Sequence, residues 1–177
     1  MTTKLRLLPY KEYKGVEKIY SVIFYYLPVF GEMYRRRVEL CLDQCKSGDS
    51  ILEVGFGSGL TFLNLNKRYK TIFGLDLTYD INLEHLKSAG LSPVFKKIKR
   101  VLKPGGQIIY GLPVECPFMV FMFRMLGYNI CEHNFAIEFE VMQAAEKVFK
   151  KISVYAMKAF PSFFGNVYEF SHFKKAE

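Results

Sequence analysis

A short apolar run followed by three alternating glycines constrains the fold of this chain more than any other feature. Residues 51–54 read ILEV, which is typical of a buried strand, and Gly55, Gly57 and Gly59 follow. Glycines there let the backbone turn sharply and let a ligand approach the main chain without meeting a Cβ atom. Residues 60–65 then indicate a helix. The segment therefore predicts a strand, a glycine loop and a helix, with room for a nucleotide-like ligand.

A carboxylate closes the next apolar run. Residues 71–75 predict a second strand, and Asp76 follows them directly. A carboxylate at this end of a second strand can accept hydrogen bonds from both ribose hydroxyls. The spacing does not match a G-x-G-x-x-G fingerprint, because the sixth position is Leu60, and the loop lacks the lysine of a P-loop.

The remaining chain alternates between helical and extended patterns. Apolar spacing predicts one N-terminal helix that ends at Pro28 and a second that starts after Gly31. Further on, the patterns predict a helix, a short strand, a strand after a Pro-Gly-Gly turn, a helix and a hairpin of two strands, over residues 80–89, 93–95, 107–112, 136–149, 151–160 and 165–173. Alternating strands and helices imply parallel pairing with right-handed crossovers.

Three motifs in this order resemble class I S-adenosylmethionine-dependent methyltransferases. Glu53 and the glycine loop are similar to the first motif of that family, Asp76 to its ribose-binding acid, and residues 100–107 (RVLKPGGQ) to the turn into its fifth strand. The resemblance implies S-adenosylmethionine as cofactor. The cofactor-binding residues that it implies are Glu53, Gly55, Phe56, Gly57, Ser58, Gly59, Asp76 and Leu77. In that family pattern the loop holds the methionine end, Asp76 holds the ribose and Glu53 orients the amino group; no metal and no catalytic residue are assigned.

The expected fold is α/β: a Rossmann-like, mostly parallel sheet flanked by helices, with an N-terminal helical extension and a C-terminal antiparallel hairpin. We expect one domain over residues 1–177, with helices over 1–48, the cofactor-binding core over 49–112 and an acceptor-side segment with the hairpin over 113–177. The resemblance implies methyl transfer to a small-molecule or lipid-like acceptor. The alternatives are a catalytically inactive methyltransferase-like binding module and an RNA methyltransferase.

The family pattern is incomplete in the middle of the chain. Residues 77–106 must hold a helix, the third strand and the helix before Pro104, which leaves no room for a fourth strand and its crossover of about a dozen residues. Either the first strand pairs directly with the strand at 107–112, or the sequence lacks a segment near Phe95 and Lys96. The second alternative is slightly favoured, because both sides of that point resemble ordinary family sequence.

Composition limits the partners. Lys plus Arg is 25 and Asp plus Glu is 17, which gives a formal net charge of +8. This charge suits an anionic membrane surface or, with less support, RNA, and a basic soluble surface is the simplest interpretation. The longest uncharged stretches, 19–31 and 104–114, are too short to span a membrane, and residues 1–14 lack a secretory signal pattern. We therefore expect a cytoplasmic protein with reduced cysteines; the oligomeric state stays open.

Weaker signals lie outside these motifs, and each has two interpretations. His133 is a base near the cofactor or an ordinary loop residue, whereas His172 is expected on the surface. Cys41 and Cys45, one helical turn apart, are expected to be buried rather than bound to zinc. The Phe- and Met-rich run at 117–125 either lines an apolar acceptor pocket or contacts a lipid interface. The N-terminal tyrosines are candidates for a lid over the site: Tyr20, Tyr25, Tyr26 and Tyr34. For both sets, packing in the core is the favoured interpretation. Two basic groups either contact phosphates or form solvated faces, the second being favoured: Arg35, Arg36 and Arg37, and Lys96, Lys97, Lys99, Arg100 and Lys103.

Overall fold

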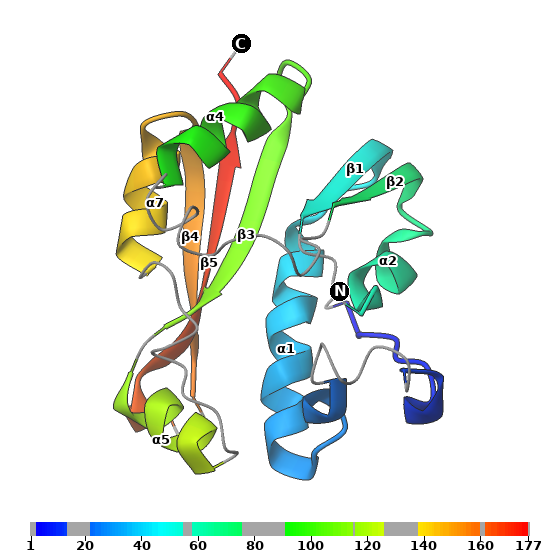
Figure 1. The fold of residues 1–177 in the computed structure, drawn as a ribbon, viewed down its shortest axis with the longest axis vertical. Coiled ribbons are helices and arrows are strands. Elements are labelled where there is room, and N and C mark those ends of the chain that lie inside the picture. Colours follow the sequence, from blue (N-terminus) through cyan, green and yellow to red (C-terminus); the bar gives the residue numbers. More distant parts are fainter. Residues whose placement is uncertain are drawn as a thin grey trace. The chain divides into compact units, whose positions relative to one another are not determined.

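The computed structural model describes residues 3–13, 22–54, 58–75, 91–114, 116–125, 138–159 and 162–176. The chain divides into two compact units, Met1–Ile81 and Asn82–Glu177. Each unit has its own sheet and its own buried apolar cluster (Figure 1). The expectation of one domain, with its internal boundaries, stays a prediction.

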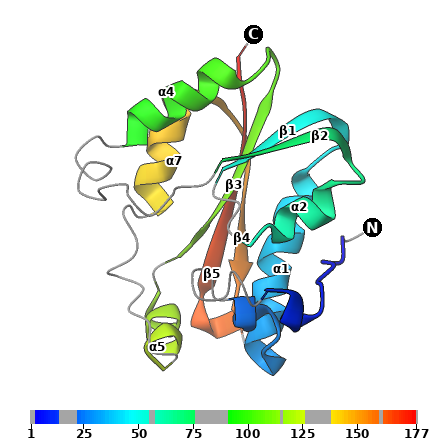
Figure 2. The same cartoon turned by 45° about the vertical axis from the view of Figure 1, so that its right-hand side comes forward.

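The first unit is built around a parallel pair of strands. Its elements are η1 (Tyr10–Tyr13), η2 (Val22–Tyr25), α1 (Pro28–Gln44), β1 (Gly48–Val54), α2 (Leu60–Leu65) and β2 (Tyr69–Leu75). The helices α1 and α2 lie on one face of the β1–β2 pair (Figure 2). Between them the side chains of Leu5, Leu42, Leu60 and Leu65 are buried together. The two predicted strands and the helix after the glycine loop are thus confirmed.

Pro28 begins α1, whereas the sequence predicted that it ends a preceding helix. A proline suits the first helical position, because its missing N–H has no partner there and its fixed φ is already helical. α1 therefore runs through Gly31 and starts earlier than predicted. Residues 22–25 form the 3-10 helix η2 instead of an α-helical end, and residues 14–21 lie outside the described residues.

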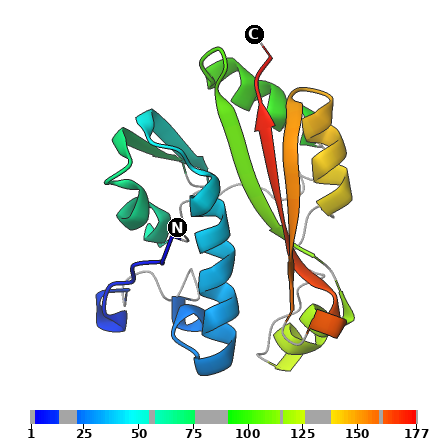
Figure 3. The same ribbon diagram turned by 180° about the vertical axis from the view of Figure 1, so that it is seen from behind.

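The second unit contains an antiparallel sheet of three strands. Its elements are α4 (Leu91–Val101), β3 (Gln107–Pro113), α5 (Pro117–Met125), α7 (Glu138–Glu146), β4 (Lys150–Lys158), η3 (Ser162–Phe164) and β5 (Asn166–Lys174). The strand order is β3-β5-β4, so β5 lies between the other two (Figure 3). The predicted C-terminal hairpin is confirmed as β4 and β5. The helix predicted over 136–149 is α7, which begins later, at Glu138, and ends earlier, at Glu146.

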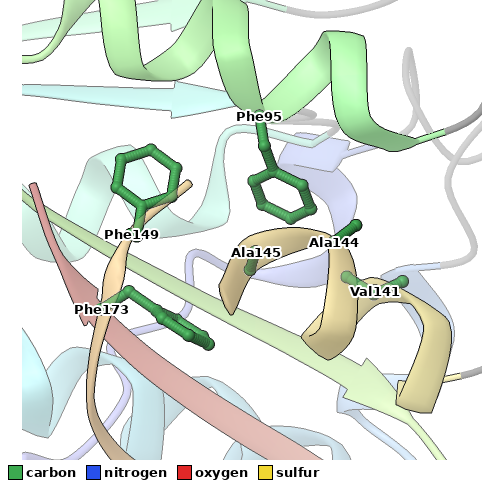
Figure 4. Close-up of a cluster of buried hydrophobic side chains, with 6 residues drawn as sticks. All are labelled: Phe95, Val141, Ala144, Ala145, Phe149 and Phe173. Carbon is green, nitrogen blue, oxygen red and sulfur yellow. The ribbon is translucent and has the colours of Figure 1, made fainter. Parts of the chain in front are cut away.

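One face of this sheet packs against α4 and α7. The buried side chains come from α4, α7, the turn after α7 and β5 (Figure 4): Phe95, Val141, Ala144, Ala145, Phe149 and Phe173. Ile108, Tyr110 and Leu112 alternate along β3 and point to the same cluster, as the two-residue period of a strand requires. Small side chains at Ala144 and Ala145 let α7 approach the sheet closely.

The short strand predicted at residues 93–95 is wrong, because these residues belong to α4. Pro93 is the third residue of this helix, where the backbone N–H has no intrahelical acceptor, so the proline costs no hydrogen bond. Phe95, Ile98 and Leu102 follow at helical spacing and pack on the buried cluster. Phe95 and Lys96 both lie within this one uninterrupted helix.

The predicted mostly parallel sheet is confirmed only in part. Among the described strands, β1 and β2 pair in parallel, and both pairings of β5 are antiparallel. The described strands form two sheets, one in each unit, and the alternative of a direct pairing between the first strand and the strand at 107–112 stays a prediction. The helix predicted at 80–89 lies outside the described residues.

Candidate functional site

The carboxyl ends of β1 and β2 lie side by side. Their register pairs Glu53 with Gly74 and Val54 with Leu75, on strands that are about 4.8 Å apart. Residues 55 and 76 each follow one of these ends directly, so the glycine loop and the predicted ribose carboxylate start from adjacent points at one edge of the sheet. Five of the predicted site residues themselves lie outside the described residues: Gly55, Phe56, Gly57, Asp76 and Leu77.

Glu53 lies on β1 with its side chain toward α1. It shares a face of the strand with Ile51, which packs on the buried cluster of the first unit. Its Oε2 atom is buried. Burial raises the pKa of the Cys45 thiol, and the Glu53 carboxylate adds to that rise. A carboxylate in this position, beside the start of the glycine loop, suits an ammonium group.

Gly59 ends the loop in a left-handed backbone conformation, with φ of 72° and ψ of 14°. Among the described residues, a Cβ atom added there would meet only Phe62 Cδ2, at 4.0 Å, so the backbone conformation demands glycine. The Gly59 carbonyl accepts the first helical hydrogen bond, from Leu63 N at 3.3 Å. Ser58, half-buried in the preceding turn, and Gly59 therefore fix how the loop enters α2.

The N-terminal segment holds α2 in place, a contribution that the sequence analysis missed. Arg6 N donates to Asn64 Oδ1 at 2.8 Å, and Asn64 Nδ2 donates back to Arg6 O at 3.0 Å. Leu5 N donates to Glu39 Oε1 on α1 at 2.9 Å, and the Leu5 side chain is buried. The one available signal is the alternation of Leu5 and Leu7, which is typical of an extended segment with one buried face.

Arg68 ties the same unit together at the end of α1. Its Nη1 donates to the carbonyl oxygens of Leu42 and Cys45, at 2.5 and 3.2 Å, and its Nη2 donates to Thr3 Oγ1 at 2.7 Å. A guanidinium at this position satisfies the last carbonyl groups of a helix and favours its dipole. The short turn between α2 and β2 is thereby anchored to α1.

The three consecutive arginines of α1 are largely engaged within the protein. Arg35 Nη1 donates to the carbonyl of Tyr25, and Arg36 pairs with Glu39 at 3.7 Å. The Arg37 guanidinium lies 4.3 Å from the centroid of the Tyr34 ring. These contacts favour a role in packing within the protein over the alternative that the three arginines bind phosphates. Tyr34 is buried, as its core interpretation requires, and Tyr20 lies outside the described residues.

Cys41, Cys45 and His172 are the weaker candidates that lie among the described residues. Burial raises the pKa of Cys41 to about 12, so its thiol is neutral at ordinary pH. No group of three metal-ligating side chains is present among the described residues. His172 is buried, contrary to prediction, because β5 is the central strand; its Nε2 lies 3.0 Å from Gln107 Oε1. His133 lies outside the described residues.

The face of β1–β2 opposite α1 and α2 is apolar and exposed. Leu52 and Phe73 are cross-strand partners, and both are exposed, as is Val54. Parallel strands are normally covered on both faces.

Comparison with solved structures shows the fold of class I S-adenosylmethionine-dependent methyltransferases, which confirms the resemblance that the motifs predicted. The chain is similar to the N-methyltransferase NodS from Bradyrhizobium japonicum WM9 in complex with S-adenosyl-L-homocysteine, at 12% identity and a TM-score of 0.55 over 93% of this chain and 98% of that one. Neither family models nor curated protein sequences match the chain.

Two further solved structures have similar folds. One is the geranyl diphosphate C-methyltransferase from Streptomyces coelicolor A3(2) in complex with Mg²⁺, geranyl-S-thiolodiphosphate and S-adenosyl-L-homocysteine, at 14% identity and a TM-score of 0.54 over 84% of this chain and 79% of that one. The other is a chain from the complex between the Haloferax volcanii Trm112 methyltransferase activator and a methyltransferase, at 12% identity and a TM-score of 0.57 over 95% of both chains. At these identities the likeness concerns the fold alone.

No described helix combines the length and the apolar character needed to cross a membrane. The cytoplasmic location stays a prediction.

Proposed function

We propose that this chain binds S-adenosylmethionine and transfers its methyl group to a small-molecule or lipid-like acceptor. One observation carries the proposal: within a class I methyltransferase fold, the parallel register sets the end of β1 beside the end of β2. Ligands of open α/β sheets bind at this carboxyl edge. Register pairs extend to Val54 and Leu75, one residue before Gly55 and Asp76.

The residues at this edge fit the chemical groups of the cofactor. The buried Glu53 carboxylate oxygen suits the methionine amino group, and the left-handed Gly59 ends the loop that the family resemblance assigns to the methionine end. Asp76 would accept hydrogen bonds from the ribose hydroxyls. S-adenosylmethionine supplies a methyl carbon that its sulfonium already activates, so the protein has to orient the reactants and exclude water.

Isothermal titration with S-adenosylmethionine and with S-adenosylhomocysteine tests the proposal. Asp76→Asn should weaken binding of both about tenfold or more, because each charge-assisted hydrogen bond is worth about 1.5–3 kcal/mol. Asp49→Asn is the matched control: Asp49 is exposed at the opposite end of β1 and pairs with Lys70 at 2.9 Å. No heat with either ligand would reject the proposal, and equal affinities of the two variants would remove Asp76 from the site.

A catalytically inactive binding module is the second candidate. The exposed apolar face of Leu52, Val54 and Phe73 favours it, since helices normally cover both faces of parallel strands. A stable protein complex without any cofactor affinity would support this candidate. The RNA methyltransferase alternative depends on charge alone, and binding of RNA that is absent or independent of salt would reject it.

A further inference from the structure

The second unit carries an aromatic surface that lies outside the proposed cofactor-binding residues. The rings of Phe118 on α5 and Phe164 on η3 are stacked, with centroids 4.7 Å apart and an angle of 23° between their planes. Phe163 follows, with its centroid 4.3 Å from that of Phe164. Figures 1 and 3 show α5 beside the turn that joins β4 to β5. Two segments distant in sequence therefore form one surface.

Large apolar side chains on this surface face solvent. Phe121, Met125 and Phe163 are 64%, 74% and 78% exposed. Phe118, Phe121 and Met125 recur at helical spacing on one side of α5, whereas Met119 is buried on another side and holds the helix against its unit. We call this group the aromatic tip; its members are the half-buried Phe118 and the exposed Phe121, Met125, Phe163 and Phe164.

Exposed basic side chains lie in both segments that form the aromatic tip. Arg124 on α5 and Lys158 at the end of β4 are exposed. Residues 116–125 and 156–168 contain no aspartate or glutamate. An apolar surface with exposed cations in its own segments complements an anionic partner.

We propose that the aromatic tip inserts into the interface of an anionic phospholipid membrane. Aromatic rings are favoured at the level of the lipid headgroups, and exposed basic side chains beside them are attracted to anionic lipids. A symmetric contact between two copies would bring Arg124 and Lys158 toward the same cations of the second copy, which like-charge repulsion disfavours. The proposal does not depend on the cofactor site, because no residue of the tip belongs to it.

Co-sedimentation of the full chain with vesicles tests the proposal. The probes are vesicles of phosphatidylcholine alone and of phosphatidylcholine and phosphatidylserine in equal parts. The chain should sediment with the anionic vesicles, less with the neutral ones, and added salt should reduce the anionic binding. The double variant F121S/F163S should lower the partition coefficient at least about tenfold, since both rings lose their burial in lipid.

Matched controls distinguish binding through the aromatic tip from non-specific binding to vesicles. Ile152→Ser removes an exposed apolar side chain from β4 and should leave vesicle binding unchanged. The double variant R124Q/K158Q should lose the preference for phosphatidylserine, whereas Lys150→Gln at the other end of β4 should keep it. Phe118 stays unchanged in every variant because its ring supports η3, and circular dichroism confirms that each variant is folded.

Three outcomes would overturn the proposal. The first is no sedimentation with either type of vesicle. The second is binding by F121S/F163S equal to that of the parent chain. The third is a dimer, measured by light scattering without lipid, that F121S/F163S abolishes while vesicle binding persists unchanged, since the tip would then be a contact between copies. Cofactor titration is a separate measurement, so loss of the proposed methyl transfer would leave this result intact.

Discussion

The loop residue Gly59 allows the site geometry to be tested through stability. Its φ of 72° lies in the left-handed region, which costs an L residue about 1–2 kcal/mol. Alanine recovers part of this, about 0.4–1 kcal/mol, because it restricts the unfolded chain. No steric term adds to the balance, since the nearest atom to an added Cβ is 4.0 Å away. Gly59→Ala should therefore lower the free energy of unfolding by about 1 kcal/mol, or the Tm by about 2–4 °C.

A second glycine provides the control for this substitution. Gly165 has a φ of 88°, no atom of the described residues lies within 4 Å of an added Cβ, and it belongs to the other unit. Gly165→Ala should cost a similar free energy in urea denaturation followed by circular dichroism, yet only Gly59→Ala should also weaken S-adenosylmethionine binding in titration. Gly59→Asn should be milder, because asparagine tolerates this conformation. A Gly59→Ala chain as stable as the parent would refute the backbone argument.

Two further substitutions test the packing. Phe173→Ala should lower the free energy of unfolding by about 3–5 kcal/mol in urea denaturation, because Phe173 is fully buried against α4 and α7, whereas Phe139→Ala on the exposed side of α7 should stay within about 0.5 kcal/mol; equal losses would contradict the described core. Burial raises the pKa of Cys41 to about 12, so its neutral thiol contributes stability that is complete below the unfolded pKa of about 8.5 and is lost as the pH rises toward 12. The Tm, measured by thermal unfolding from pH 8 to 11, should therefore fall more steeply for the parent than for Cys41→Ala. Parallel curves of Tm against pH would show that this thiol is not buried.

The local elements near the glycine loop were predictable because short-range pattern decides them. Residues 51–54 and 71–75 are apolar runs bounded by glycine or a charged residue, and they form β1 and β2. The hairpin of β4 and β5 was equally predictable, since its strands are close in sequence. The prediction failed at Pro93, where proline suggested an extended segment; its tolerance in a first helical turn depends on the position of the helix start, which pattern alone does not define.

Residues that hold the candidate site in place were harder to find. Arg68 and Asn64 carry ordinary sequence signals, and their roles arise from hydrogen bonds to segments far away in the chain: the start of the chain and the end of α1. Likewise, nothing in the spacing of His172 shows that it is buried, because its burial follows from the central place of β5 in the sheet.

The sequence by itself determined the order of strand, glycine loop and helix, the acid after the next strand, and thereby the class of fold, because backbone freedom and apolar periodicity are local properties. Only the tertiary structure decided that β1 and β2 end side by side, that β5 separates β3 from β4, and that Phe163 joins α5 in one exposed surface. These are long-range pairings, in which many alternatives have similar local energies and the burial of apolar surface selects among them.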